Sequence, residues 1–418
     1  MYNILTFENG LRLVYEQIPY VKSVAVGIWV GTGSRNETMK NNGVSHFVEH
    51  MIFKGTEKRS AKAIAECIDG IGGQINAFTG KECTCYYTKT LDTHIDIVFD
   101  LLSDMLLNSK FLQSDVDIEK KVIMEEINMY EDSPEELVHD LLSEISWKKD
   151  PLGYSILGTE KTLAKMNNKS LKAYVESNYN PWNTIISVAG NFDVEFLKNL
   201  VNKNFVHWKK ERIPEGFLAP VKLTPANQYK EKEIEQVHVC IGFDGLEHNN
   251  IELYTLLAVN NILGGGMSSR LFQKIREEHG LVYSIYSYPS SYSNGGIFNI
   301  YAGMNPELME KVLGLIGREV IDLKKKGILE DELTKTKEQL KGNYILGLES
   351  TSSRMNNIGK SLLLLGKIFT QEEVLNKIDE IDMESVENII EQVFNVDRVS
   401  MAVVGQINKK IDFSNYLK

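Results

Sequence analysis

The sequence predicts an α+β protein made of two duplicated α/β sandwich domains, each with a mixed sheet covered by helices. Three observations support this prediction. The chain has 418 residues, which is long for one hydrophobic core and fits two domains of about 200 residues. It is 43% hydrophobic and 25% charged, as globular proteins are. Short segments also recur in the second half at a nearly constant spacing.

The repeat is clearest in two pairs of apolar segments that contain glycine. VAVGIWVG around Gly27 resembles VCIGFDG around Gly242, and the two glycines are 215 positions apart. TIISVAGN around Gly190 resembles VSMAVVGQ around Gly405, again at a spacing of 215. Two acidic helix starts, FLQSDVDIEKKVI and ILEDELTKTKEQL, recur at nearly this distance. Three pairs at nearly one spacing indicate an internal duplication, with strands, then helices, then strands in each half.

The domain boundaries follow from a proline-rich stretch between the halves. HWKKERIPEGFLAPVKLTP contains three prolines and no hydrophobic period, so we interpret residues 207–225 as a linker. Residues 1–206 then form the N-terminal domain, and residues 226–418 form the C-terminal domain. At the start of the chain, apolar and polar residues alternate around Asn9 and Gly10, which predicts a β-hairpin and not a signal peptide.

Charge and cysteine content narrow the classes of function. The formal net charge of -11 argues against a nucleic-acid partner. No apolar run approaches the ~18 residues of a membrane span. Four cysteines are too few for a disulfide framework in a chain of this length, so we expect free thiols in a reducing compartment, the cytoplasm. These cysteines are Cys67, Cys83, Cys85 and Cys240.

The stretch GVSHFVEHMIFKGT carries the most specific chemical signal. If VSHFVEHMIF is helical, His46 and His50 are four residues apart, so both imidazoles can reach one ion. Glu49 then lies beside this ion without being a ligand. Two imidazoles are typical zinc ligands, and the carboxylate can take a proton from the water that attacks a substrate carbonyl. Apolar neighbours would bury the helix, where two histidines and a glutamate would be costly to leave unpaired.

The duplication helps to distinguish a site from a packing feature. The positions 215 residues after the two histidines and the glutamate hold none of these residue types. They are Asn261, Gly264 and Gly265. A packing role common to both halves would leave some trace of the motif, and none remains. We therefore expect one metal site in the N-terminal domain and no metal ligands in the C-terminal domain.

A catalytic zinc site needs a third protein ligand, and DIEKKVIMEEINMYEDSPEE offers several carboxylates in a helical pattern. Glu119 and Glu126 are seven residues apart, which is two helical turns, so they share one face. Glu125 competes as a ligand because its own face also carries apolar residues. Periodicity alone leaves the choice between Glu125 and Glu126 open.

These motifs resemble a known family. HFVEH followed by EKKVIMEEI is similar to the inverted-motif zinc peptidases, which include pitrilysin, insulin-degrading enzyme, the mitochondrial processing peptidase and short two-domain bacterial relatives. In this family a glutamate about 76 residues past the second histidine is the third ligand, which implies Glu126. A glutamate seven residues earlier supports the site, which implies Glu119. The resemblance implies one Zn2+ per chain, and the ligand types suit zinc best among divalent ions.

Two further motifs extend the resemblance. GGQINAFTGKECTCYY is similar to the family's edge strand, which pairs with the bound peptide, and this implies substrate contacts at Asn76 and Ala77. IREEHGLVYSIYS is similar to the family's arginine and tyrosine pair, which implies that Arg276 and Tyr283 contact the substrate or the transition state. The C-terminal domain would therefore bind substrate. For a two-domain chain the family implies a homodimer that closes as a clamshell and shares its sites between subunits.

Together, the residues and the resemblance predict a zinc metalloendopeptidase that hydrolyses unfolded peptides. Glu49 is the expected base, and Arg276 and Tyr283 are the further catalytic residues. The alternative is a non-catalytic binding or assembly subunit related to the processing peptidases. Such subunits lose ligands or the base, whereas this sequence retains both. We expect broad specificity, because pairing along an edge strand recognises the main chain of the substrate.

Overall fold

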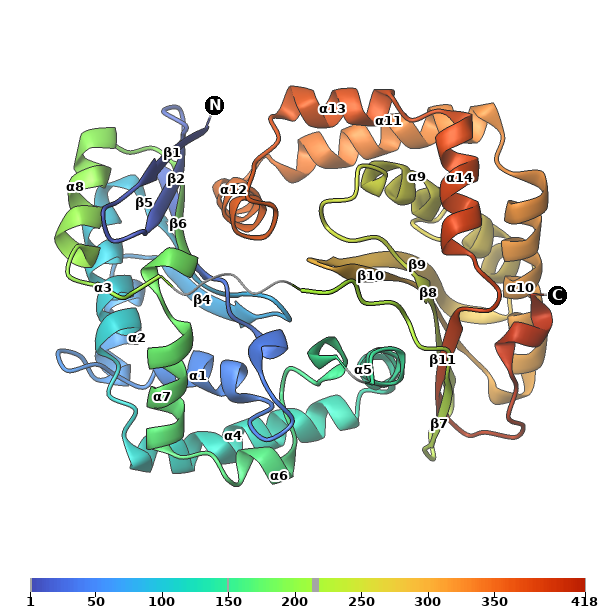
Figure 1. The fold of residues 1–418 in the computed structure, drawn as a ribbon, viewed down its shortest axis with the longest axis horizontal. Coiled ribbons are helices and arrows are strands. Elements are labelled where there is room, and N and C mark those ends of the chain that lie inside the picture. The colour runs from blue at the N-terminus through green and yellow to red at the C-terminus, as the bar shows by residue number, and fades with distance from the viewer. Residues whose placement is uncertain (1, 149, 213–217, 418) are drawn as a thin grey trace. The chain divides into compact units, whose positions relative to one another are not determined.

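The computed structural model describes residues 2–148, 150–212 and 218–417, and it contains two sheets covered by helices (Figure 1). The expected α+β class is confirmed. The chain divides into two compact units: unit 1 contains residues 1–127, 154–216 and 346–370, and unit 2 contains residues 128–153, 217–345 and 371–418. Residues 213–217 of the expected linker lie outside the described residues. None of the described helices combines the length and apolar composition that a membrane span requires.

Unit 1 is built on a six-stranded sheet in the order β1-β2-β6-β3-β5-β4. β2 and β6 run parallel, and the other neighbours are antiparallel. The expected N-terminal hairpin is confirmed as β1 and β2, with Thr6 opposite Arg12. The strands are β1 (Tyr2–Thr6), β2 (Arg12–Gln17), β3 (Ser23–Val30), β4 (Gln74–Thr79), β5 (Thr84–Leu91) and β6 (Thr184–Gly190).

Helices cover both faces of this sheet (Figure 1). α1, α2 and α3 contact its strands on one face, whereas α12 lies against β2, β3 and β6 on the other. The helices wholly in unit 1 are α1 (Val44–Ile52), α2 (Ala61–Asp69), α3 (Ile95–Asn108), α6 (Glu160–Leu163), α7 (Asn168–Asn178), α8 (Val194–Phe205) and α12 (Thr351–Leu365). α4 (Gln113–Glu131) begins in unit 1 and ends in unit 2.

Burial on both faces explains why β3 is apolar at nearly every position. Val24, Val26 and Ile28 belong to the core that contains residues of α1 and α3. Ala25 and Trp29 belong to the separate core that contains residues of α12. A strand buried on both sides is read as a continuous apolar run and not as an alternating one.

Unit 2 contains a five-stranded sheet in the order β7-β11-β8-β10-β9. β7 and β11 run parallel, and the other neighbours are antiparallel. The strands are β7 (Asn227–Glu231), β8 (Val237–Asp244), β9 (Val282–Tyr292), β10 (Gly295–Met304) and β11 (Val399–Gly405). The helices are α5 (Pro134–Ser146), α9 (Leu253–Leu263), α10 (Met309–Lys326), α13 (Gln371–Asp379) and α14 (Met383–Val393), together with most of α11 (Glu330–Gly347).

The two sheets confirm the duplication. Replacing β2, β6, β3, β5 and β4 by β7, β11, β8, β10 and β9 converts one strand order into the other and keeps each pairing direction. β6 and β11 are 215 residues apart at both ends, and so are α7 and α14. Unit 1 has one additional strand, β1. The repeat identified from short segments therefore extends over whole domains.

One helix of each half packs in the unit of the other half. α5 lies against β8 and β11 in unit 2, and its counterpart α12 lies against the sheet of unit 1. The approach of α12 is close: a Cβ atom on Gly359 would be 2.3 Å from Nε1 of Trp29 and 2.7 Å from Oγ of Ser187. The units thus exchange segments. The expected domains, residues 1–206 and 226–418, describe the two copies of the repeat along the chain, and their limits stay a prediction.

Candidate active site

α1 carries the His-x-x-Glu-His motif into the interior of unit 1. The helix is buried on most of its surface, as expected, through Val44, Ser45, His46, Phe47, Val48, Met51 and Ile52. Glu49 and His50 are half-buried. The expected helix is confirmed, and its two histidines lie one turn apart with ring centroids separated by 4.5 Å.

The N-terminus of α1 is held by a carboxylate that the sequence analysis did not single out. Glu37 is 3% exposed and accepts hydrogen bonds from the main-chain N–H groups of Gly43 (2.7 Å) and Ser45 (2.8 Å). These bonds satisfy amides that the start of a helix leaves without partners. Gly43 has φ of 92°, a left-handed conformation that favours glycine. Glu37 therefore fixes where the helix that carries His46 and His50 begins.

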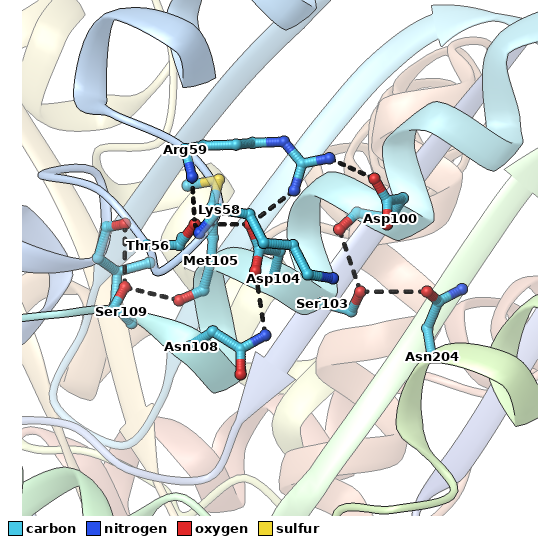
Figure 2. Close-up of polar contacts among 11 residues, drawn as sticks. Thr56, Lys58, Arg59, Asp100, Ser103, Asp104, Met105, Asn108, Ser109 and Asn204 are labelled. Atoms are coloured by element: carbon cyan, nitrogen blue, oxygen red, sulfur yellow. Dashed lines mark hydrogen bonds and ion pairs between the residues drawn. The ribbon is translucent and has the colours of Figure 1, made fainter.

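A second buried carboxylate holds the loop after α1 (Figure 2). Asp104 of α3 accepts hydrogen bonds from Thr56 Oγ1 (2.6 Å), Arg59 Nη1 (2.6 Å) and Asn108 Nδ2 (3.0 Å). Arg59 also pairs with Asp100. Burial alone would raise the pKa of Asp104, but these hydrogen bonds and the charge of Arg59 lower it. Carboxyl groups thus hold both the start of α1 and the loop that follows it.

Three potential metal ligands converge in unit 1. Nε2 of His46 lies 3.2 Å from Nε2 of His50 and 3.6 Å from Oε2 of Glu126. Nε2 of His50 lies 3.5 Å from the same carboxylate oxygen. Of the two carboxylates that periodicity left open, the structure brings Glu126 to the histidines, whereas Glu125 is exposed and outside the group.

The spacing of these three atoms fits a tetrahedral zinc ion. With bonds of about 2.1 Å, two ligand atoms of a tetrahedral zinc site lie about 3.4 Å apart. The three observed separations thus match one face of such a tetrahedron and leave its fourth position for water or substrate. Among the described residues, no other group of three histidine, cysteine or acidic side chains is arranged to hold a metal ion.

The expected supporting residue, Glu119, lies behind His50. Its Oε1 is 2.9 Å from Nδ1 of His50, and its Oε2 is 2.6 Å from Nζ of Lys54. A carboxylate that accepts the Nδ1 proton directs the Nε2 lone pair of the imidazole toward a metal. Nδ1 of His46 has no hydrogen-bond partner among the described residues, so the orientation of this ring depends on packing.

The electrostatics of the group also suit a cation. Burial and the neighbouring His50 lower the pKa of His46 to about 4. Burial alone would lower the pKa of His50 too, but Glu119 and Glu126 raise it to about 9. The hydrogen bond with His50 lowers the pKa of Glu126 despite burial. A proton on His50 thus offsets the charges of two carboxylates, and a bound divalent cation can take over this role.

Glu49 interacts electrostatically with His50 and Glu126, two of the three potential ligands, and its environment suits a general base. Burial raises its pKa, and the charge of Glu126 acts in the same direction. A hydrogen bond from Thr79 and the charge of His50 oppose this rise. A carboxylate with a raised pKa accepts a proton more readily near neutral pH. Thr79, which donates to Oε2 of Glu49 at 2.5 Å, was not identified from the sequence.

Asn76 and Ala77 lie on β4, the edge strand of the sheet of unit 1. The hydrogen bond from Gly80 N to Cys83 O makes Thr79 and Thr84 a non-hydrogen-bonded pair. Because such pairs alternate along antiparallel strands, the main-chain groups of Ala77 point away from β5 and toward the free edge. The N–H of Ala77 is bonded to Oδ1 of Asn76 at 2.8 Å. β4 can therefore accept another strand once this side chain moves aside.

Arg276 and Tyr283 lie together in unit 2. The Arg276 guanidinium is 5.6 Å from the ring centroid of Tyr283, which is 76% exposed. Arg276 belongs to the short π-helix Phe272–Glu278, and Tyr283 to the edge strand β9. The structure thus brings these two residues to each other. Their relation to the histidines, which belong to unit 1, stays a prediction.

Comparisons with known proteins identify the family of this chain. Residues 12–160 match the model described as "Insulinase (Peptidase family M16)", and residues 165–340 match "Peptidase M16 inactive domain". The chain belongs to peptidase family M16. The word "inactive" in the second description agrees with the second half of this M16 chain, which lacks the His-x-x-Glu-His motif. The residues at the corresponding positions are Asn261, Gly264 and Gly265, and the last two follow the end of α9 at Leu263.

Relatives of this M16 chain match along nearly its whole length. "Uncharacterized zinc protease YmxG" of Bacillus subtilis is 47% identical over 396 residues, which are 94% of this chain and 95% of that protein. An uncharacterized zinc protease of Streptomyces coelicolor is 37% identical over 412 residues, which are 97% and 90% of the two chains. A protease structure from Helicobacter pylori has a TM-score of 0.90 at 22% identity and covers 97% of this chain and 99% of its own. This last likeness shows the fold alone.

Proposed function

We propose that this chain is a zinc-dependent metalloendopeptidase that hydrolyses unfolded peptides. The observation that carries the proposal is the group formed by His46, His50 and Glu126, with Glu49 beside it. Two imidazole nitrogens and one carboxylate match the ligand set of catalytic zinc sites, which keep one position open. The presence of the ligands and the base favours an enzyme over a non-catalytic assembly subunit.

In the proposed reaction, His46, His50 and Glu126 would hold a zinc ion, which would supply Lewis-acid chemistry for the activation of water and the polarisation of the scissile carbonyl. Glu49 accepts the proton of the water as its oxygen attacks the carbonyl carbon. The same carboxyl group then delivers this proton to the leaving nitrogen when the C–N bond breaks. Glu119 accepts a hydrogen bond from Nδ1–H of His50, so that Nε2 of His50 would remain available as a ligand.

The substrate class follows from β4. A peptide in extended conformation can pair with the free edge of this strand through its main chain, as in other cases of β-strand addition. The Asn76 side chain would leave the Ala77 N–H for this purpose. Such pairing needs an unfolded segment and selects little by side chain. We therefore propose unstructured peptides as substrates, with broad specificity.

The proposal also covers the oligomeric state of the protein and its cellular compartment. We propose a homodimer in which Arg276 and Tyr283 of one subunit act on the substrate at the zinc site of the other. Tyr283 would donate a hydrogen bond to the developing oxyanion. The four cysteines are free, and three of them are buried, which supports a reducing compartment such as the cytoplasm.

Chelation and replacement of the base test this function. We expect the purified chain to cleave an unstructured, internally quenched peptide, and a chelator to abolish the cleavage until zinc is returned. Glu49→Gln keeps the shape of the side chain but removes its basicity, so it should retain zinc and lose about 100-fold or more of kcat. Cleavage by metal-free protein at the full rate, or by Glu49→Gln at the wild-type rate, would refute the proposal.

A further inference from the structure

The hydroxyl of Thr79 is bonded directly to the proposed base. Its Oγ1 lies 2.5 Å from Oε2 of Glu49, and both side chains are half-buried. Among the described residues, Thr79 is the one hydrogen-bond donor to this carboxylate. Within the described part of the chain, Oε1 of Glu49 accepts no hydrogen bond. The two oxygens of the base therefore differ: one is engaged by the protein, and the other is left for reaction.

The backbone holds Thr79 firmly in this place. Thr79 is the last residue of β4 and lies opposite Thr84 of β5. The hairpin that follows is bonded to the segment before α1, through Ser34 N to Gly80 O (3.1 Å) and Arg35 N to Lys81 O (2.8 Å).

An ion pair reinforces the same connection. Arg35 and Glu82 lie 2.6 Å apart, and both side chains are almost completely buried. The segment that contains Arg35 leads to Glu37, which holds the start of α1. The hydroxyl donor on β4 and the carboxylate acceptor on α1 are thus positioned by one connected framework.

We propose that Thr79 is a positioning residue of the reaction: its hydroxyl holds Oε2 of Glu49 and leaves Oε1 as the proton acceptor. This inference rests on the proposed function. Thr79 keeps its own proton throughout, while Oε1 receives a proton from water and later returns it to the leaving nitrogen.

Thr79 also connects the base to the substrate strand. Its main-chain N–H and C=O groups point toward the free edge, because Thr79 and Thr84 form a non-hydrogen-bonded pair. The side chains of Ala77 and Thr79 lie on the same face of β4, since side chains alternate along a strand. A peptide paired with this edge would contact the residue that orients Glu49. One residue would thus align the substrate backbone and the proton acceptor.

Three variants test the role of the hydroxyl. Thr79→Val removes it with little change of shape, and Thr79→Ser retains it. Thr88→Val is the matched control: Thr88 lies on the neighbouring strand β5, and its buried Oγ1 has no hydrogen-bond partner among the described residues. Cleavage of the quenched peptide is measured as kcat and KM. Zinc affinity is measured separately by competition with a chelator.

We expect Thr79→Val to lower kcat by about 10- to 100-fold, because a misoriented base loses much of its effect. KM, zinc affinity and thermal stability should stay near their wild-type values. Thr79→Ser should keep kcat within about threefold, and Thr88→Val should leave it unchanged. In a Glu49→Gln background, Thr79→Val should have no further effect, since the two residues act as a unit.

The possible results are distinguishable. Wild-type kcat in Thr79→Val would overturn the role of Thr79 and leave the proposed function intact. Loss of zinc or of stability in Thr79→Val, without rescue by serine, would also overturn it, because the effect would be structural. A wild-type chain that binds zinc and cleaves no peptide would refute the proposed function and this inference together.

Discussion

Oε1 of Glu119 lies 2.9 Å from Nδ1 of His50, on the side of the imidazole opposite the group of ligand atoms. Glu119 is 3% exposed and is also paired with Lys54. Because of this arrangement, the Nδ1 proton is held by the protein and Nε2 is free to bind a metal. The proposed metal site would therefore extend beyond its three potential ligands to a buried carboxylate and a lysine.

Glu119→Ala should weaken zinc binding by about 10- to 100-fold, because His50 would lose the acceptor that orients it. Glu119→Gln should have a smaller effect, since the amide oxygen can still accept the Nδ1 proton. Zinc affinity measured by chelator competition checks both. Glu125→Ala is the control, because this exposed residue of the same helix should leave the affinity unchanged. Equal affinities for Glu119→Ala and the wild type would contradict the support role.

Asp104 should make the stability of the protein depend on pH. Its folded-state pKa is lowered, so the stabilisation is present above the ordinary value of about 3.9 and is lost as the pH falls through the folded value. At pH 7, Asp104→Asn should cost about 2–3 kcal/mol of unfolding free energy. The wild type should also lose stability more steeply than Asp104→Asn below about pH 4.

Denaturant unfolding at several pH values measures this difference. The control is Asp100→Asn, because Asp100 binds the same arginine but its side chain is 50% exposed. An exposed ion pair contributes about 1 kcal/mol or less, so this variant should keep the pH dependence of the wild type. If Asp104→Asn kept that dependence as well, another carboxyl group would have to be its source.

Gly359→Ala should disturb the docking of α12. The added Cβ would lie 2.3 Å from Nε1 of Trp29, a side chain that is 1% exposed and has little room to move. Overpacking of this kind costs about 1–3 kcal/mol. Gly342→Ala in α11 is the matched control, since its Cβ would have no neighbour within 4 Å. This control should be neutral or stabilise by up to about 1 kcal/mol. Unfolding free energies that are equal for the two variants would contradict the close packing.

Mixed dimers test whether Tyr283 acts on the partner's zinc site. Glu49→Gln and Tyr283→Phe chains with different tags are co-expressed, and the mixed dimer is purified. If sites are shared, one of its two sites has both an intact base and an intact tyrosine, so roughly half of the wild-type activity should return. If each chain is self-sufficient, both sites carry a defect. Activity no higher than the mean of the two parent variants would then refute the shared site.

The helix with the His-x-x-Glu-His motif could be predicted because its information is local. His46 and His50 need only one helical turn to meet, and the apolar residues between them predict burial. The third carboxylate is 76 positions away from His50, so the choice between Glu125 and Glu126 depends on how α4 packs. Periodicity had left this choice open, and the resemblance to the family pointed to the carboxylate that the structure brings to the histidines.

Other features could not be deduced from the sequence for physical reasons. The apolar face of α12 predicts that the helix is buried, but it does not specify which sheet the helix covers. In the structure, α5 of the first half belongs to unit 2, and α12 of the second half belongs to unit 1. Glu37 and Thr79 act through tertiary contacts with α1, and neither has a characteristic spacing from the helix. In the sequence, Glu37 has the appearance of an ordinary loop residue and Thr79 that of an ordinary strand residue.

The zinc content of two neighbouring variants tests the central claim most directly. Wild type, Glu126→Gln and Glu125→Gln are purified and dialysed in parallel, and bound zinc is counted per chain by mass spectrometry. We predict about one zinc for the wild type and for Glu125→Gln, and little or none for Glu126→Gln, because Glu126 lies within 3.6 Å of Nε2 of each histidine and Glu125 is outside this group. Zinc retained by Glu126→Gln and lost from Glu125→Gln would contradict the metal centre described above.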